Sequence, residues 1–233
     1  RYNSKMHERV IWFFIFISCI AFNNAIAKNL SDGFVELEKF IPTIKLDIRY
    51  YTSDNFVGER IDGYESPKAL LTILAAEALK NVQAELVASG LSLKVYDAYR
   101  PQRAVDHFVR WAKDLDDIKM KLKYYPEVDK MNLFTKGYID GRSGHSRGST
   151  VDVTIVSLSD PELVELDMGT NWDFFSPSSW PQSSIVTLQQ RANRLLLYNV
   201  MSKHGFKPHN EEWWHFTLEN EPYPDHYFDF PIQ

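Results

Sequence analysis

Two short segments of the sequence carry histidine and carboxylate at a spacing that suits a metal ion. In the first, residues 143–152 (SGHSRGSTVD), His145 lies on a glycine-punctuated turn and Asp152 follows within a predicted strand. Imidazole and carboxylate are ligand types that a catalytic zinc prefers, with three protein ligands and a fourth position left for water. Taken alone, such a segment is more often a surface loop with a capping carboxylate.

The second segment, residues 211–215 (EEWWH), supplies a third possible ligand, His215, and an acid three residues earlier, Glu212. Zinc lowers the pKa of a bound water to about 7, and a nearby carboxylate can take its proton as the water attacks. In a regular strand, residues three apart point to opposite faces, so Glu212 must lie on a turn or bulge. Without the first segment, two core tryptophans flanked by solvated charges are the simpler interpretation.

A third segment, residues 97–101 (DAYRP), places Arg100 where a predicted strand meets a predicted helix. Its guanidinium could stabilise the oxyanion that develops on a scissile carbonyl, because charged donors contribute most in a site shielded from water. On local evidence, Asp97 and Arg100 could equally form a structural pair at the start of the helix.

Other chemistries have less support in the sequence. His204 is placed at the C-terminus of a predicted helix, where positive charge is favourable, and His107 lies within a helix, which leaves His209 as the spare ligand candidate. A serine nucleophile is a poor fit because no G-x-S-x-G elbow is present.

The periodicity of the chain predicts one α+β domain that positions these segments. Strands are expected over Leu91–Tyr96, before Arg100, over 150–158 and over 213–218. Pro101 begins a helix that runs to about Asp114, since proline suits a first helical position. Two more helices are expected, from Ser66-Pro67 to near Gly90 and over 185–204 with a stop at Gly205. Residues 121–141 are expected to form a loop with a short helix.

The N-terminus predicts export. After Met6 an apolar run from Val10 to Phe22 precedes Ala25-Ile26-Ala27, the pattern of a secretory signal peptide, and the run is shorter than the ~20 residues needed to span a bilayer. We therefore expect residues 1–27 to be removed, leaving a domain over 28–233 that is periplasmic or secreted. A retained anchor, or lipidation at Cys19, is the alternative.

The expected mature protein is acidic and has no cysteine, because Cys19 is the only one in the sequence. Residues 1–27 hold three basic residues and one acid, so their removal changes the formal charge from −5 by −2 to −7. An acidic exported protein without basic runs is a poor candidate for binding nucleic acid or anionic lipid. Disulfides and thiol chemistry are also excluded.

Together the three segments resemble the D-alanyl-D-alanine dipeptidases within the zinc D,D-peptidase group. The signature of that group, S-x-H-x-x-G-x-A-x-D followed by E-x-x-H, is matched here except that Thr150 replaces the alanine. The resemblance extends to residues 48–56 (IRYYTSDNF), 96–101 (YDAYRP) and 221–224 (EPYP).

The resemblance implies an α+β fold around a central antiparallel sheet flanked by helices, and hydrolysis of D-Ala-D-Ala to two D-alanines. It implies one zinc ion as cofactor and a small dipeptide as the partner; the oligomeric state stays open. The roles that it implies are metal ligands at His145, Asp152 and His215, a general base at Glu212, oxyanion stabilisation by Arg100, and substrate contacts from Asp173, Ser143 and Tyr50.

Asp173 lies in residues 168–173 (MGTNWD), a segment that resembles the one whose aspartate contacts the substrate ammonium in the dipeptidases. A buried carboxylate selects a free amino terminus, because an acylated peptide would leave that acid unpaired in a dry site. The alternatives are a zinc D,D-carboxypeptidase that trims longer wall peptides, a non-catalytic wall-binding module, and a zinc-dependent partner-recognition domain.

Overall fold

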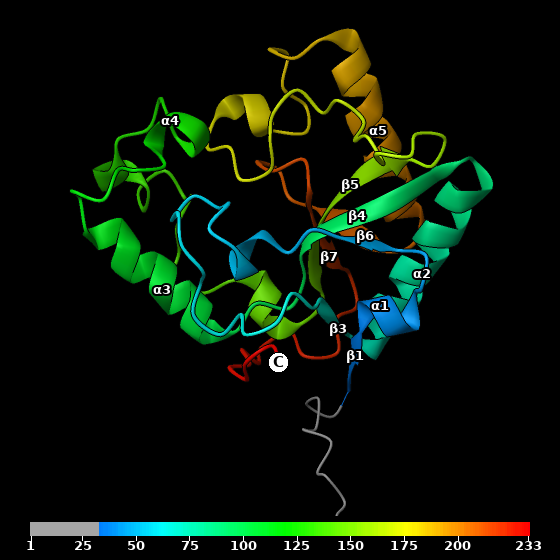
Figure 1. The fold of residues 1–233 in the computed structure, drawn as a ribbon, viewed down its shortest axis with the longest axis horizontal. Coiled ribbons are helices and arrows are strands. Elements are labelled where there is room, and N and C mark those ends of the chain that lie inside the picture. Colours follow the sequence, from blue (N-terminus) through cyan, green and yellow to red (C-terminus); the bar gives the residue numbers. More distant parts are fainter. Residues whose placement is uncertain (1–32) are drawn as a thin grey trace, which may run out of the picture.

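A five-stranded sheet forms the centre of the computed structural model, which describes residues 33–233 (Figure 1). The strand order is β2-β4-β5-β7-β6, with β2 parallel to β4 and every other pair antiparallel. A separate two-stranded sheet pairs β1 with β3. The strands are β1 Phe34–Glu36, β2 Lys45–Leu46, β3 Leu70–Thr72, β4 Leu91–Asp97, β5 Thr150–Ser157, β6 Phe206–Pro208 and β7 His215–Leu218.

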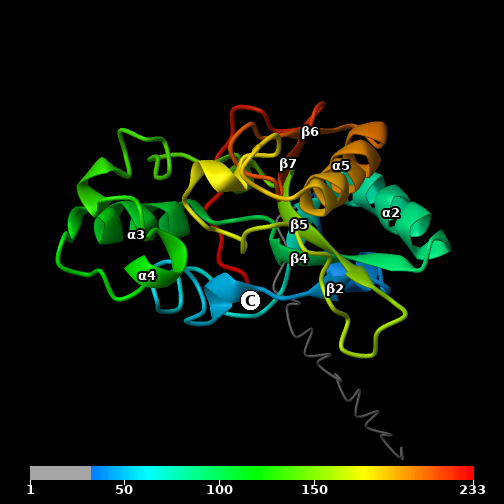
Figure 2. The same ribbon diagram turned by 90° about the horizontal axis from the view of Figure 1, so that it is seen from above.

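Two long helices pack side by side on one side of the sheet, α2 against β4 and α5 against β6 (Figure 2). The other long helix, α3, lies with α4 at the opposite end of the molecule, in both views. The helices are α1 Leu37–Phe40, α2 Ile73–Ala88, α3 Gln102–Lys113, α4 Lys121–Tyr124 and α5 Leu188–Lys203. No helix within residues 33–233 combines the length and apolar character that crossing a membrane requires.

The main core lies between these helices and the sheet. Leu79 and Val82 of α2 and Val95 of β4 are fully buried, and burial of each such side chain stabilises the fold by about 1.5–3 kcal/mol. The buried amide of Gln83 joins helix to strand, because its Oε1 accepts the Leu93 N–H at 2.8 Å and its Nε2 donates to Ser92 Oγ at 2.9 Å. These contacts fix the position of β4, the strand that leads into Arg100.

The expected α+β fold with a central antiparallel sheet flanked by helices is confirmed, apart from β2, which pairs with β4 in parallel. The helix predicted from Ser66-Pro67 is wrong over its first two turns, because residues 70–72 form β3 and α2 begins only at Ile73. Leu70 and Leu71 fit a helical period and a fully buried strand equally well, and pairing with β1 decides between them. The predicted signal peptide, residues 1–27, lies outside the described residues, so export and the boundary at 28 stay predictions.

The other predicted elements differ only at their ends. Helix α5 begins at Leu188 rather than at Ile185, because Thr187 forms a capping box with Gln190: each side chain accepts a hydrogen bond from the backbone N–H of the other residue. It ends before Gly205, whose φ of +86° favours glycine. Strand β7 begins at His215 instead of Trp213, so the paired tryptophans belong to the preceding turn.

Candidate metal centre and active site

The register of the central sheet brings two of the predicted ligands together. Asp152 of β5 lies directly opposite His215 of β7, and Asp97 of β4 lies opposite Asp152 on its other side. Directly paired residues on neighbouring strands share one face and have Cβ atoms about 4.5–5.5 Å apart. The sheet therefore presents Asp97, Asp152 and His215 in a row, although they are far apart in the chain.

The third predicted ligand comes from a one-turn 3₁₀ helix, Gly144–Arg147, that leads into β5. Ser143 caps this turn by accepting the His145 backbone N–H at 3.3 Å, and Gly148 ends it with a φ of +79°. A Cβ on Gly148 would lie 2.3 Å from the ring of Phe34. Glycine is therefore required there both for the left-handed backbone and for the close approach.

The ring of His145 is oriented by a backbone carbonyl. Its Nδ1 lies 2.7 Å from the oxygen of Ala98, and a carbonyl can only accept, so Nδ1 carries the proton. The lone pair of Nε2 is left free, as a second-shell hydrogen bond commonly arranges for a metal-binding histidine.

Three ligand atoms converge at one point. His145 Nε2, His215 Nδ1 and Asp152 Oδ1 lie 3.2 Å from one another on all three sides. Tetrahedral zinc with ligands at about 2.0–2.2 Å would separate neighbouring ligand atoms by roughly 3.4 Å. These residues form the single cluster of three or more potential ligands found within residues 33–233. The donor set and its spacing fit zinc.

The carboxylate of Asp152 divides its two oxygens between tasks. Oδ2 accepts the indole N–H of Trp172 at 3.1 Å, whereas Oδ1 is buried without a hydrogen bond of its own. A buried acceptor without a partner is costly, and a metal ion in the triangle would satisfy it. Burial opposes ionisation of Asp152, but the two neighbouring histidines hold its pKa well below the usual value.

Glu212 lies where a base would have to be. Its Oε2 is 3.3 Å from His215 Nδ1, and the side chain keeps 27% of its exposure. The geometric difficulty noted from the sequence is resolved because Glu212 lies in the turn before β7, where the His215 N–H approaches the Glu212 carbonyl at 3.4 Å. Glutamate and histidine can therefore face the same point.

Arg100 forms the structural pair with Asp97 that the sequence left open, and its role toward an oxyanion stays a prediction. Its Nε and Nη2 each lie 2.9 Å from Asp97 Oδ2, which makes the structural pair. The same guanidinium also lines the cavity beside the metal ligands, with Nη2 at 3.7 Å from Asp152 Oδ2 and Nη1 at 3.5 Å from Ser143 Oγ. Asp97 in turn accepts the Tyr64 hydroxyl at 2.6 Å.

Asp173 and Tyr50 form a buried pair on the wall of this cavity. The Tyr50 hydroxyl donates to Asp173 Oδ2 at 2.6 Å, and Asp173 adopts a left-handed backbone with a φ of +57°. Such a conformation is uncommon for a non-glycine residue. Burial and the negative charge of Asp152 raise the pKa of Asp173 well above its usual value. A cationic partner would favour its ionised form.

All eight residues selected from the sequence line one cavity of about 380 Å3 or contact its walls. Seven of them line it: Tyr50, Arg100, Ser143, Asp152, Asp173, Glu212 and His215. His145 supplies the third corner of the ligand triangle; it is fully buried and does not line the cavity itself. The substitution at Thr150 is accommodated, because its hydroxyl is 2.8 Å from that of Thr217.

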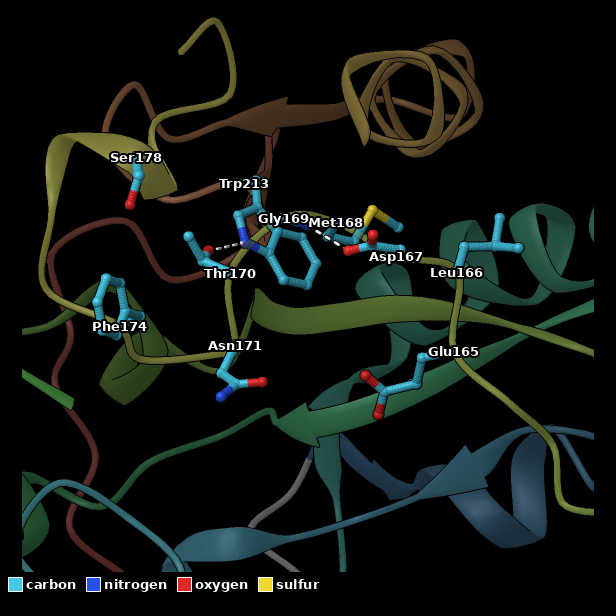
Figure 3. Close-up of a pocket in the computed structure, with 10 residues that line it drawn as sticks. All are labelled: Glu165, Leu166, Asp167, Met168, Gly169, Thr170, Asn171, Phe174, Ser178 and Trp213. Carbon is cyan, nitrogen blue, oxygen red and sulfur yellow. Dashed lines mark hydrogen bonds between the residues drawn. The ribbon is translucent and has the colours of Figure 1, made fainter. Parts of the chain in front are cut away.

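The loop that carries Asp173 also lines a second cavity, of about 520 Å3, whose lining includes none of the three candidate metal ligands (Figure 3). There Trp213 donates its indole N–H to Thr170 Oγ1 at 2.9 Å. The buried guanidinium of Arg194 donates to the carbonyls of Met168, Trp180 and Ser178 at 2.6–2.9 Å. These hydrogen bonds hold the loop on which Asp173 adopts its left-handed backbone conformation.

Sequence reasoning assigned no role to Trp172 or Tyr64, whose bonds to Asp152 and Asp97 orient the site. The polar end of a buried aromatic residue was the available signal, but the partner cannot be identified without the fold. His209, the spare ligand candidate, is not part of the triangle. Its ring lies edge-on to that of His215, with centroids 5.1 Å apart.

Residues 30–233 match the family model described as D-ala-D-ala dipeptidase. The chain belongs to this family. A D-alanyl-D-alanine dipeptidase of Enterococcus faecalis is 40% identical over 203 residues, which cover 87% of this chain and all of the relative. One from Streptomyces coelicolor is 39% identical over 203 residues, with the same coverage of both chains.

A more distant relative and a solved structure also match. A D-alanyl-D-alanine dipeptidase of Escherichia coli is 34% identical over 79% of this chain and 83% of its own length. The structure, a mutant of the vancomycin resistance D,D-pentapeptidase VanY in complex with Zn(II), is 16% identical with a TM-score of 0.40. It covers 76% of this chain and 83% of that one.

Proposed function

We propose that this protein is a zinc dipeptidase that hydrolyses D-alanyl-D-alanine to two D-alanines. The observation that carries the proposal is the convergence of His145 Nε2, Asp152 Oδ1 and His215 Nδ1 at 3.2 Å, with Glu212 beside them. Family membership supports the choice of substrate, since the relatives are named for this dipeptide.

Three residues would hold the metal: His145, Asp152 and His215. Zinc bound there supplies Lewis acidity, which lowers the pKa of water and polarises a peptide carbonyl. Glu212 is 3.3 Å from His215 and partly exposed, so it can accept the proton of the attacking water and return it to the departing D-alanine nitrogen. Its microenvironment is open enough for a water to reach it.

Arg100 contributes a fixed positive charge at the wall of the cavity. Because Asp97 holds its Nε and Nη2, the guanidinium does not have to reorient when negative charge develops on the scissile carbonyl oxygen. Preorganised donors of this kind are the most effective stabilisers of an oxyanion. Its remaining nitrogen, Nη1, lies 3.5 Å from Ser143 Oγ, so both groups are available on the same side of the cavity.

Asp173 explains why a free dipeptide would be preferred. Its carboxylate is buried and has one side-chain partner, the Tyr50 hydroxyl, so a substrate ammonium would complete its environment. An acylated amino terminus would leave the acid without a cation in a dry site, which is costly. The same feature disfavours the D,D-carboxypeptidase alternative.

D-alanine release from free D-Ala-D-Ala and from an N-acylated D-Ala-D-Ala peptide tests the proposal. We expect cleavage of the free dipeptide alone, abolished by chelator and restored by zinc. Cleavage of the acylated peptide at a comparable rate would make the protein a carboxypeptidase. Cleavage of neither would favour a wall-binding module, although all three ligands and Glu212 are retained.

We also propose that the enzyme is exported and acts in the periplasm or outside the cell. The support is the signal-peptide pattern of residues 1–27. An exported dipeptidase meets peptides released from the wall rather than cytoplasmic precursors. N-terminal sequencing of the protein from its native cells should begin at Lys28, and an unprocessed cytosolic protein would refute export.

A further inference from the structure

The cavity beside the candidate metal site is lined by three arginines, and they differ in whether a carboxylate of the protein pairs with their charge. They are Arg100, Arg142 and Arg147. Arg100 is paired with Asp97, and Arg147 is paired with Glu221 in a two-pronged contact, Nε to Oε2 and Nη2 to Oε1, each at 2.8 Å. Both of these guanidinium groups are committed to carboxylates of the protein itself.

Arg142 has no such partner. Within residues 33–233 its guanidinium makes neither an ion pair nor a side-chain hydrogen bond, and it rests on the face of Tyr227, 4.9 Å from the ring centroid. Asp140, the nearest acid along the chain, accepts the Gly141 backbone N–H instead. Stacking on an aromatic face leaves the edge of the guanidinium, with its fork of N–H donors, free for a ligand.

The cavity lining therefore contains both a buried acid and an unpaired cation. Asp173 provides a buried carboxylate, and Arg142, which lines the same cavity, provides an exposed cation with no ion-pair partner among the described residues. A free dipeptide is a zwitterion that carries an ammonium at one end and a carboxylate at the other. Of the three cavity arginines, Arg142 is the one whose guanidinium has no carboxylate partner within residues 33–233.

We propose that Arg142 binds the C-terminal carboxylate of the substrate and makes the enzyme selective for peptides that end in a free acid. The proposal rests on the proposed dipeptidase function and adds a second selection to it. Asp173 selects the amino end and Arg142 selects the carboxyl end, so only a molecule short enough to engage both is bound well. Guanidinium and carboxylate match each other in a planar, two-pronged geometry.

Tyr227 is the positioning residue for this contact. Its ring lies 4.9 Å from the Arg142 guanidinium and 5.7 Å from that of Arg147, measured to the ring centroid, so one aromatic ring contacts both the paired and the unpaired arginine. Replacing the ring by an aliphatic side chain would leave Arg142 charged but unsupported. Phenylalanine keeps the face, so Tyr227→Phe should preserve selectivity while Tyr227→Leu reduces it.

Hydrolysis of D-Ala-D-Ala and of its C-terminal amide, D-Ala-D-alaninamide, tests the inference. The wild-type enzyme should prefer the acid in kcat/KM. Arg142→Gln should lower kcat/KM for the acid about 10- to 100-fold, mainly through KM, because hydrogen bonds between charged groups are the stronger ones in proteins. Its effect on the amide should be far smaller, so the preference collapses. Arg142→Lys should retain part of the preference.

The matched control is Arg191→Gln, because Arg191 is also exposed but lines a groove beside α5 rather than this cavity. It should retain the wild-type preference. If Arg142→Gln keeps the preference for the acid while the wild type hydrolyses the dipeptide, the inference is wrong and the proposed function stands. If the wild type hydrolyses neither substrate, the proposed function fails and the inference fails with it.

Discussion

Trp172→Phe should weaken zinc binding without removing any ligand. The indole N–H of Trp172 donates at 3.1 Å to Asp152 Oδ2, and the next donor to that oxygen, Arg100 Nη2, is 3.7 Å away. Phenylalanine keeps an aromatic ring but no donor, so the ligating carboxylate loses the bond that orients it. Loss of a second-shell partner costs about 10- to 100-fold in metal affinity, which equals about 1.4–2.7 kcal/mol.

Trp111→Phe is the control for this change. Trp111 is also a buried core tryptophan, but its indole nitrogen has no hydrogen-bond partner. Both substitutions remove the same atoms and cost packing energy, so a comparison of the two isolates the bond to Asp152. Zinc affinity is measured by competition with a chromogenic chelator, and the free energy of unfolding by urea denaturation of both variants.

The two variants should unfold at similar urea concentrations, and the zinc affinity of Trp172→Phe should be at least tenfold below that of Trp111→Phe. At saturating zinc, Trp172→Phe should recover much of its turnover because Glu212 and Arg100 are untouched. Equal zinc affinities in the two variants would refute the role of Trp172 in orienting Asp152.

Four further predictions concern single residues. Glu212→Gln should retain zinc and lose turnover by about 10²–10⁴-fold; near-wild-type kcat would remove Glu212 as the base. Asp173→Asn should raise KM for the dipeptide more than it lowers kcat, because it removes the charge opposite the ammonium, and an unchanged KM would contradict that role. Arg194→Met should destabilise the fold by about 2–4 kcal/mol in urea denaturation, since three carbonyls lose their donor, whereas a loss below 1 kcal/mol would show that water replaces it. Burial opposes ionisation of Asp229, but Arg103 lowers its pKa, so the full stabilisation by the pair is present above the usual carboxyl pKa and is lost as pH falls through the lowered pKa. Asp229→Asn should cost less than about 1 kcal/mol at pH 7 and progressively less in acid, and a loss independent of pH would refute the ion pair.

The candidate ligands could be selected from the sequence because their signals are local. His145 lies in a turn and Asp152 in the strand that follows it. Glu212 likewise lies in a turn, and His215 begins the next strand. What could not be predicted is the register that places Asp152 opposite His215, because strand pairing is decided by contacts between distant segments. The turn at Glu212 could be inferred from the sequence only indirectly, because Glu212 and His215 could not otherwise face the same point.

The elements that were missed are short or depend on tertiary contacts. Strands β2 and β6 are two and three residues long, too short to show an alternating pattern. The apolar period of residues 70–72 is compatible with a helix, and only pairing with β1 makes them a strand. The bonds from Trp172 and Tyr64 to the site carboxylates likewise join residues far apart in the chain.

Zinc titration of the chelated, metal-free protein while D-alanine release from D-Ala-D-Ala is followed tests the central claim most directly. The triangle formed by His145, Asp152 and His215 predicts that activity rises with added zinc and reaches its plateau at one equivalent. Alanine at any one of the three ligands should abolish that rise. Full activity of the metal-free protein, or a zinc-saturated protein that leaves the dipeptide intact, would contradict the account.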